Sequence, residues 1–389
     1  MSFSGGLYLT LFIGENVPAP APEELMQAVQ KVEVTVTNET SGFQIVFSAG
    51  RNSSAEASEY ALLDNPSIKL FNRIIIMVSF GVDPKVLIDG VILNHQFNPS
   101  HEPGKTTFTI TGLDLSVMMD FKKERKPFPN SGHADIVEQI LKNYTKYGLK
   151  AKIIPPDSPG TPMENNSIPA QLLTDLQYIR KLAGLHESAG KKYVFYIEPT
   201  VSGEGIAYWG PPDYKGPAQG PLSFNMDEFT NVNSLNFGMD ALKQSTLEGP
   251  VQNPEDGKTV DVKSPPPNSD EKLAKKPITD FIDTNKQIVN DLRGGSGISV
   301  EEAINKAKVE KSKSSEAVTL TGELDTLRYG DVLKARHLVA LRGVGQSYNG
   351  LYYVKKVTHT ITKGSYKQNF TLTREGLGST IQTVKMNEQ

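Results

Sequence analysis

The stretch from Val86 to Leu149 constrains the fold of this 389-residue chain more than any other part of the sequence. Two strand patterns, over 86–93 and 106–111, lead to a Gly-Leu-Asp corner and then to an amphipathic helix pattern over 133–144. The apolar residues first alternate with the period of a half-buried strand and then change to the helical period. This order predicts a β-domain that continues into one helix. The positions that mark its turns and ends are Gly90, Gly112, Asp114 and Gly148, the last as a left-handed helix C-cap.

Composition excludes several classes of protein. A formal net charge of -3 gives no general attraction to nucleic acid or to an acidic membrane. Because the chain has no cysteine, disulfides, thiolate metal sites and cysteine nucleophiles are excluded. The apolar run Leu7–Ile13 is too short for a secretory signal and follows no basic region, and Ile74–Val78 is far too short to span a membrane. We expect a protein that is made in the cytoplasm without a signal peptide and does not insert into a membrane.

Strand patterns dominate both ends of the chain. Up to about residue 121, alternating apolar residues and turn signals predict a hairpin and several further strands. The segment Ile74–Val78 is apolar on both faces, which indicates a strand that is covered on both sides or lies against another subunit. From residue 316 onward the pattern is again β, with turns at Asn349-Gly350 and Lys363-Gly364. The sequence therefore predicts a β-domain at each end of the chain.

The middle of the chain mixes helices, strands and low-complexity sequence. A helix is predicted from about Ala170 to Gly184 inside a small α+β module. Residues 249–276 are rich in proline and charge, so we expect a flexible or extended linker. Two helices with thin apolar faces should follow and dock on a neighbouring element, one near 278–292 and one opened by the capping box Ser299-Val-Glu-Glu302. The inward-facing residues expected in the helix that ends at Gly184 are Leu172, Leu173, Leu176, Ile179 and Leu182.

Two further segments carry a family resemblance. The helix pattern over Asp175–Gly184 precedes a strand over Tyr193–Ile197. Near the end of the chain, a strand over Asn349–Val354 precedes a short strand with His359 and a last strand that ends at Arg374. With the 86–149 stretch, these segments resemble the central hub proteins of contractile phage tails and related injection machines, the phage late control D and VgrG type. The structural motif positions of this resemblance are Gly90, Gly112, Asp114, Gly148, Gly184, Gly350, Tyr352, His359 and Arg374.

The resemblance implies a fold that is mainly β with an α+β insertion. Each chain would hold two β-barrel-like tube domains plus a small module of helices and strands. Residues 1–121 would form the first tube domain, 122–221 the inserted α+β module, and 222–246 strands that return to the β framework. Residues 247–315 would be linker and helices, and 316–389 the C-terminal part of the second tube domain.

The resemblance also implies partners. Three chains would close into a homotrimeric ring of pseudo-six-fold symmetry that adapts a hexameric inner tube protein to a trimeric spike, beside other baseplate components. Tape-measure protein or cargo could occupy the lumen. The chain ends within a few polar residues after Arg374, with no needle or lysozyme-like domain, so the spike is expected to be a separate protein. The protein would be made in the bacterial cytoplasm and end in an assembled particle.

No motif for catalysis, cofactor binding or metal binding is present. No two histidines share the i, i+4 spacing of a helical metal site, and no Gly-x-Ser-x-Gly elbow occurs. The glycine-rich segments 294–297 and 343–345 lack the Lys-Ser/Thr pair of a phosphate-binding loop. We therefore expect a structural protein with no cofactor, in which His359 is a cross-strand partner. The six histidines are His95, His101, His133, His186, His337 and His359.

Two alternatives stay open from the residues alone. A glycan- or peptidoglycan-cleaving enzyme of the same assembly would need a pair of acids from among Asp114, Asp120 and Glu124, although Asp114 is better placed as a helix cap or Asx-turn. A carbohydrate-binding β-protein would need exposed aromatic rings, and Trp209 is the only tryptophan. The short basic run Lys122–Lys126 indicates a solvated loop or a contact with an acidic neighbouring subunit.

Overall fold

A computed structural model gives the structure of the protein, and far more of its described residues lie in strands than in helices. The predicted mainly-β fold with small helical parts is therefore confirmed. Among the residues that the structure describes, no helix is long and apolar enough to cross a membrane. The structure describes residues 2–3, 7–15, 17–50, 62–102, 104–157, 169–188, 190–243, 245–252, 257–264, 272–282, 288–292, 300–312 and 316–381.

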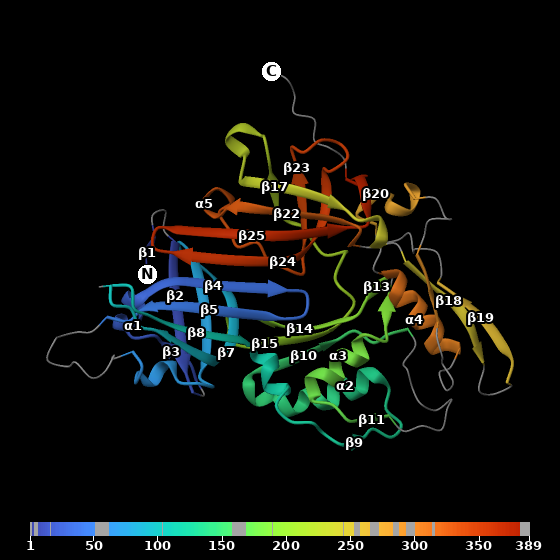
Figure 1. Cartoon of the computed structure of the whole chain (residues 1–389), viewed down its shortest axis with the longest axis horizontal. Coiled ribbons are helices and arrows are strands. Elements are labelled where there is room, and N and C mark those ends of the chain that lie inside the picture. Colours follow the sequence, from blue (N-terminus) through green and yellow to red (C-terminus); the bar gives the residue numbers. More distant parts are fainter. Residues whose placement is uncertain are drawn as a thin grey trace.

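One main sheet joins the two ends of the chain (Figure 1). Its path runs β1-β2-β6-β7-β8-β5-β4-β24-β25-β22-β17, with β3 beside β2, β23 beside β24, and β16 beside β23. The N-terminal and C-terminal halves meet where β4 pairs antiparallel with β24, so that Val34 lies opposite His359. The strands are β1 (Ser2–Phe3), β2 (Leu7–Gly14), β3 (Ala19–Pro20), β4 (Val29–Thr37), β5 (Ser41–Ser48), β6 (Arg73–Phe80), β7 (Asp83–Asn98), β8 (Thr107–Asp114), β16 (Gln219–Ser223), β17 (Val232–Met239), β22 (Val318–Asp325), β23 (Leu338–Arg342), β24 (Gly350–Thr362) and β25 (Ser365–Arg374).

Two apolar cores lie on the inner face of this sheet, one on each side of the β4–β24 junction. Alternate residues of each strand point into them, as the period of two requires. Val32, Ile45 and Phe47 are fully buried in the N-terminal core. Leu320 and Leu372 are fully buried in the C-terminal core. Each such side chain contributes about 1.5–3 kcal/mol through burial.

A smaller module of helices and strands covers one side of the main sheet and has its own core around Trp209 (Figure 1). The helix α2 continues as the 3-10 turn η3, which ends at Gly148 with a φ of 77°, so the predicted left-handed cap is confirmed. The elements of this module are η2 (Leu115–Met119), β9 (Lys126–Pro127), α2 (His133–Leu141), η3 (Lys142–Tyr147), β10 (Leu149–Ile153), β11 (Ala170–Gln171), α3 (Asp175–Ala183), β12 (Glu187–Ser188), β13 (Lys191–Lys192), β14 (Val194–Pro199) and β15 (Gly205–Gly210).

The predicted start of the second helix at Ala170 is wrong. Ala170 and Gln171 pair as strand β11 with β9, and the helix α3 begins after Thr174, whose side chain accepts a hydrogen bond from the Gln177 N–H. The competing strand pairing keeps the segment before Thr174 extended. As a result Leu172, expected to face inward, is 66% exposed.

The segment 247–315 also differs from its prediction. Its described residues build a small sheet of β18 (Ser245–Gln252), β19 (Thr259–Lys263) and β21 (Ile288–Asp291), against which α4 (Val300–Ser312) packs. The predictions of a linker over 249–276 and of a helix over 278–292 are therefore wrong for the residues of these ranges that the structure describes. The physical reason is strand pairing: β21 adds in parallel to β18, and the valines of β18 and β19 supply a small core for α4.

The helix predicted after Ser299 is confirmed as α4, which docks on a neighbouring sheet as expected. Its capping serine and the side chain of Glu302 lie outside the described residues. Residues 274–277 form β20, which pairs with β26 of the C-terminal half. The remaining elements are α1 (Glu23–Ala28), η1 (Pro66–Ile68), η5 (Asp227–Phe229), η6 (Ala241–Lys243), β20 (Ala274–Pro277), η7 (Ile278–Asp280), α5 (Thr326–Tyr329) and β26 (Gly376–Ser379).

Candidate functional site

The outer face of the main sheet is polar over most of its width. Because side chains alternate across a strand, the residues between the buried core positions all stand on this second face. The strand registers align them in rows that cross from the C-terminal half to the N-terminal half without a break. We call this surface the polar face. One row consists of Asp325, Lys367, Thr360, Glu33, Gln44, Thr111 and Asn94, and another of Asn236, Thr321, Thr371, Lys356 and Thr37.

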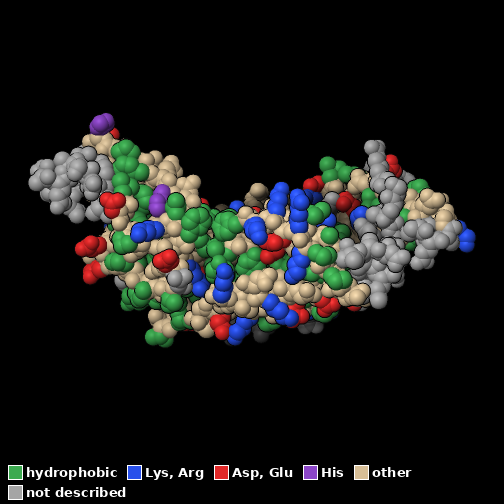
Figure 2. Space-filling model, turned by 90° about the horizontal axis from the view of Figure 1, so that it is seen from below, with side chains coloured by type: hydrophobic (Ala, Val, Ile, Leu, Met, Phe, Trp, Pro, Cys, Tyr) green, Lys and Arg blue, Asp and Glu red, His purple; other side chains and the backbone are tan. Residues whose placement is uncertain are grey.

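Charges on the polar face are largely balanced. Lys31 pairs with Glu33 at 2.7 Å, and Lys367 pairs with Glu323 at 3.0 Å. At the junction of the two halves, the hydroxyls of Thr35 and Thr358 lie 3.1 Å apart. A face of hydroxyls, amides and paired charges is compatible with contact to water. In the view from below, Figure 2 shows the molecule hollowed along one long edge, with a lobe at either end.

Arg336 holds the three parts of the chain together from a buried position. Its side chain donates hydrogen bonds to the Thr37 carbonyl at 2.8 Å and to the Ser41 hydroxyl at 3.2 Å, both in the N-terminal half. It also donates to the Ile197 carbonyl of the α+β module at 3.4 Å. The residue is 5% exposed and has a φ of 70°, a conformation that non-glycine residues adopt rarely. Burial lowers the pKa of the Arg336 guanidinium, which Asp114 counteracts.

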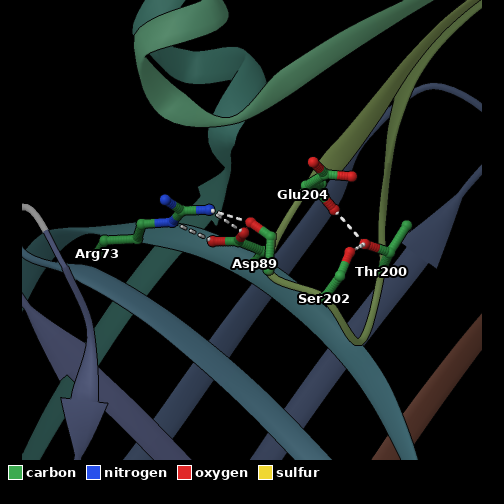
Figure 3. Close-up of polar contacts among 6 residues, drawn as sticks. Arg73, Asp89, Thr200, Ser202 and Glu204 are labelled. Carbon is green, nitrogen blue, oxygen red and sulfur yellow. Dashed lines mark hydrogen bonds and ion pairs between the residues drawn. The ribbon is translucent and has the colours of Figure 1, made fainter.

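A second polar contact fixes the α+β module to the N-terminal half (Figure 3). Arg73 of β6 forms two hydrogen bonds with the Asp89 carboxylate of β7, at 2.8 and 2.5 Å, and Asp89 is 3% exposed. The same guanidinium donates to the Gly203 carbonyl at 3.2 Å, in the turn between β14 and β15. The hydrogen bond with Asp89 raises the pKa of Arg73, so this cation persists at any physiological pH.

Gly90, Gly112 and Asp114 lie together at the β7–β8 pairing. A Cβ on Gly112 would lie 2.0 Å from the Val91 carbonyl oxygen, and one on Gly90 would lie 2.4 Å from the Leu113 carbonyl oxygen. Asp114 accepts hydrogen bonds from the Ser116 N–H at 2.9 Å and the Ser41 N–H at 2.6 Å. The expected Asx-type cap is therefore present, and both carboxylate oxygens are occupied by backbone donors.

Tyr352 and Arg374 lie together at the end of the C-terminal half. The Arg374 guanidinium stacks on the Tyr352 ring, 4.3 Å from its centroid, and donates to the carbonyls of Ser347 and Asn349. The Tyr352 hydroxyl donates to the Tyr348 carbonyl at 2.7 Å. Gly350 begins β24 directly after this loop, with a φ of 127°. These residues thus form one structural unit that fixes the loop before β24.

His359 and Gly184 lie apart from these groups. His359 is buried between β4 and β25, with its Nδ1 atom 3.0 Å from the Tyr366 hydroxyl. Burial lowers its pKa to about 3. Gly184 ends α3 in a right-handed conformation. The motif positions therefore do not converge on one site.

The acids of the enzyme alternative are each engaged separately. Asp120 accepts a hydrogen bond from the Thr174 hydroxyl, and Glu124 pairs on the surface with Lys122 at 3.0 Å. Across the described ranges, no group of three histidine, aspartate or glutamate side chains could hold a metal ion. Trp209 is fully buried and donates to the Ile179 carbonyl, so it offers no sugar platform.

Sequence reasoning missed two side-chain groups. Arg336 contacts Ser41, 295 residues earlier in the chain, and no local pattern indicates this contact. His133 and His186 lie 2.8 Å apart in the α+β module, although 53 residues separate them in sequence. Burial, with a smaller effect of His133, lowers the pKa of His186 to about 4. Only the folded chain brings these groups together.

The fold is similar to solved tail proteins at low sequence identity. A tail protein from Neisseria meningitidis MC58 is 11% identical, with a TM-score of 0.58 over 96% of this chain and 98% of that chain. A 43 kDa tail protein of prophage MuSo2 from Shewanella oneidensis is 12% identical, with a TM-score of 0.63 over 95% and 98%. The chain has the tail-protein fold.

A similar fold also occurs in a PdpA-VgrG complex from Francisella. The chain matches 55% of a chain in the Francisella PdpA-VgrG complex, with 98% of its own length, 10% identity and a TM-score of 0.54. No family model and no curated protein matches the sequence. The likeness therefore rests on the arrangement of strands and helices.

Proposed function

We propose that the protein is a structural hub of a contractile injection machine, such as a phage tail, a tailocin or a type VI-like system. Three copies form a ring of pseudo-six-fold symmetry, to which each copy contributes two β-lobes. The ring adapts a hexameric inner tube protein to a separate trimeric spike protein and contacts other baseplate components. The role is one of assembly and symmetry matching, and it needs no catalytic step.

The continuous polar face carries this proposal. The β4–β24 pairing joins two separately cored lobes into a single wall, and polar rows cross the junction without interruption. A wall of this kind suits the lumen of a ring, where water or a passing chain covers it. The tail-protein fold supports the same reading.

The surfaces available for ring closure lie at the edges of the sheet. Among the described residues β17 pairs only with β22, so its other edge is open over eight residues without a charge or a proline. Natural proteins protect such edges or use them for pairing. Met239 at its end and Leu242 just beyond are 49% and 70% exposed.

An exposed aromatic pair supplies a second candidate contact. Phe71 and Phe121 are 59% and 56% exposed, and their ring centroids lie 5.9 Å apart. Phe71 is held at a φ of 68°, which a bulky residue adopts only at an energetic cost. Aromatic side chains of this kind are typical anchors of protein interfaces. We propose that this pair contacts a neighbouring subunit.

The oligomeric state of the purified full chain tests the proposal. Light scattering should give three times the 42.6 kDa chain mass, and negative-stain electron micrographs should show rings. Met239→Lys should shift the mass toward the monomer, because a charge beside the β17 edge opposes pairing. Leu327→Lys on α5, a residue that is 53% exposed, serves as the control. A protein that stays monomeric at high concentration would rule out the proposed ring.

A further inference from the structure

A groove with an excess of lysines lies where β24 and β25 meet the α+β module and α4. It has a volume of about 650 Å³. Five lysines line it against two carboxylates, Glu39 and Glu316. We call it the basic groove, and its lysines are Lys191, Lys192, Lys243, Lys355 and Lys356.

Three of these lysines face solvent without an ion-pair partner in the described ranges. Lys355 pairs with Glu316 at 2.5 Å, and Lys191 lies over the Tyr214 ring at 4.1 Å. No carboxylate among the described residues pairs with the other three, which are all exposed: Lys192, Lys243 and Lys356. The groove therefore carries positive charge that the described residues do not neutralise.

Two buried hydroxyls line the same groove. Tyr353 and Thr373 are each 1% exposed, and within the described residues neither hydroxyl has a hydrogen-bond partner. A buried hydroxyl without a partner costs about 1–3 kcal/mol, and few native groups stay in this state. Burial raises the pKa of Tyr353, so its hydroxyl remains a proton donor at neutral pH. Both groups are thus suited to donate a hydrogen bond to an acceptor that enters the groove.

We propose that the basic groove binds an acidic segment of a partner protein, with carboxylates paired to Lys192, Lys243 and Lys356 and hydrogen bonded by the buried hydroxyls. A nucleic acid fits less well. Among the residues that the structure describes, no arginine lines the groove to hold phosphates in a bidentate way. Tyr214 and Tyr353 stack on each other at 4.7 Å and are buried, so no ring face is open to a base.

The groove continues onto the polar face, because Lys356 and Thr371 line both the groove and a neighbouring hollow over β22 and β17. An acidic segment bound in the groove would therefore extend along the polar face. The direction of this segment, toward the lumen of a ring, rests on the proposed function. The binding itself does not depend on the ring.

Peptide binding to the full chain tests the inference. The probe is a fluorescein-labelled (Glu-Ser)5 peptide, measured by fluorescence anisotropy beside (Gln-Ser)5 and a single-stranded oligothymidylate. The acidic peptide should bind, and the neutral peptide should not. The triple variant K192Q/K243Q/K356Q should raise the Kd at least tenfold. The matched variant K105Q/K123Q/K363Q removes the same charge elsewhere and should change it less than twofold.

Tyr353→Phe separates binding from folding. Loss of an unpartnered hydroxyl should leave the folded state as stable as before or more stable, while the Kd of the acidic peptide rises about threefold or more. Absence of acidic-peptide binding at 1 mM, equal Kd values in both triple variants, or tighter binding of the oligothymidylate would each overturn the inference. A monomer that binds the peptide would contradict the ring alone, and a ring that does not bind it would contradict the groove alone.

Discussion

The guanidinium of Arg336 lies 4.1 Å from the centroid of the Tyr196 ring. This contact joins the C-terminal half of the chain to β14 of the α+β module, while the hydrogen bonds of the same guanidinium reach Thr37 and Ser41 of the N-terminal half. Ser41 is in turn held by Asp114 through its backbone N–H. One buried cation therefore fixes the relative position of three separately cored parts.

Arg336→Met should destabilise the fold by about 3 kcal/mol, because it removes the buried guanidinium that donates to the carbonyls of Thr37 and Ile197. Arg336→Lys keeps the charge but loses the planar fork, and should give an intermediate loss. Urea unfolding followed by fluorescence measures both. Arg328→Met on the exposed surface of α5 is the control and should change stability by less than about 0.5 kcal/mol. An Arg336→Met protein as stable as the control variant would contradict this role.

Gly112→Ala should lower the free energy of unfolding by about 3 kcal/mol. The new Cβ would lie 2.0 Å from the Val91 carbonyl oxygen, which cannot move without breaking the β7–β8 pairing. Gly50→Ala is the control, because a Cβ there meets no atom within 4 Å. Chemical denaturation of both variants makes the comparison. Equal stability of the two would show that close backbone approach does not select glycine at this corner.

Stability should fall in mild acid because His359 is buried in its neutral form. Its pKa in the folded state is about 3, below the ordinary value of 6.5, so only the unfolded chain binds a proton between these values. The stabilisation is therefore complete above pH 6.5 and decreases by up to about 1.4 kcal/mol per pH unit as the pH falls toward 3. His186, with a pKa of about 4, adds a similar loss between 6.5 and 4.

His359→Gln tests this prediction. Unfolding free energies at pH 7.5, 6 and 5 should depend less steeply on pH in the variant than in the native protein. His101→Gln, at an exposed position, should leave the slope unchanged. Identical pH slopes in His359→Gln and the native protein would be the contrary result.

Phe71→Gly should stabilise the single chain while weakening its assembly. Glycine adopts the φ of 68° without strain, so the unfolding free energy should rise by up to about 1 kcal/mol. Loss of the exposed ring should at the same time raise the dissociation constant of the ring, measured by light scattering on dilution. A variant that is less stable and assembles normally would show that Phe71 serves the fold of one chain and not an interface.

Local patterns were enough for elements whose partners are close in sequence. Alternation predicted the strands of both halves, and the caps at Gly148 and Asp114 follow from the residues around them. Local patterns gave the wrong element where pairing with a distant strand competed with local preference. Ala170 and Gln171 joined β9 instead of a helix, and Ile288–Asp291 joined β18.

The candidate sites depend still more on the tertiary structure. The polar face needs the β4–β24 pairing, which joins segments more than 300 residues apart, as the Thr35–Thr358 contact shows. The basic groove gathers lysines from three separate segments of the chain. Neither could be read from spacing, because spacing reports only neighbours within a few residues.

The sequence by itself determined the alternation of the strands in both halves and the caps at Asp114 and Gly148, because side-chain period and backbone freedom are local properties. The tertiary structure decided which strands lie side by side, that Arg336 joins three parts of the chain, and that unpaired lysines line one groove beside buried hydroxyls. Those outcomes depend on contacts between distant segments. Such contacts form only when the burial of both apolar cores compensates the entropy of bringing the segments together.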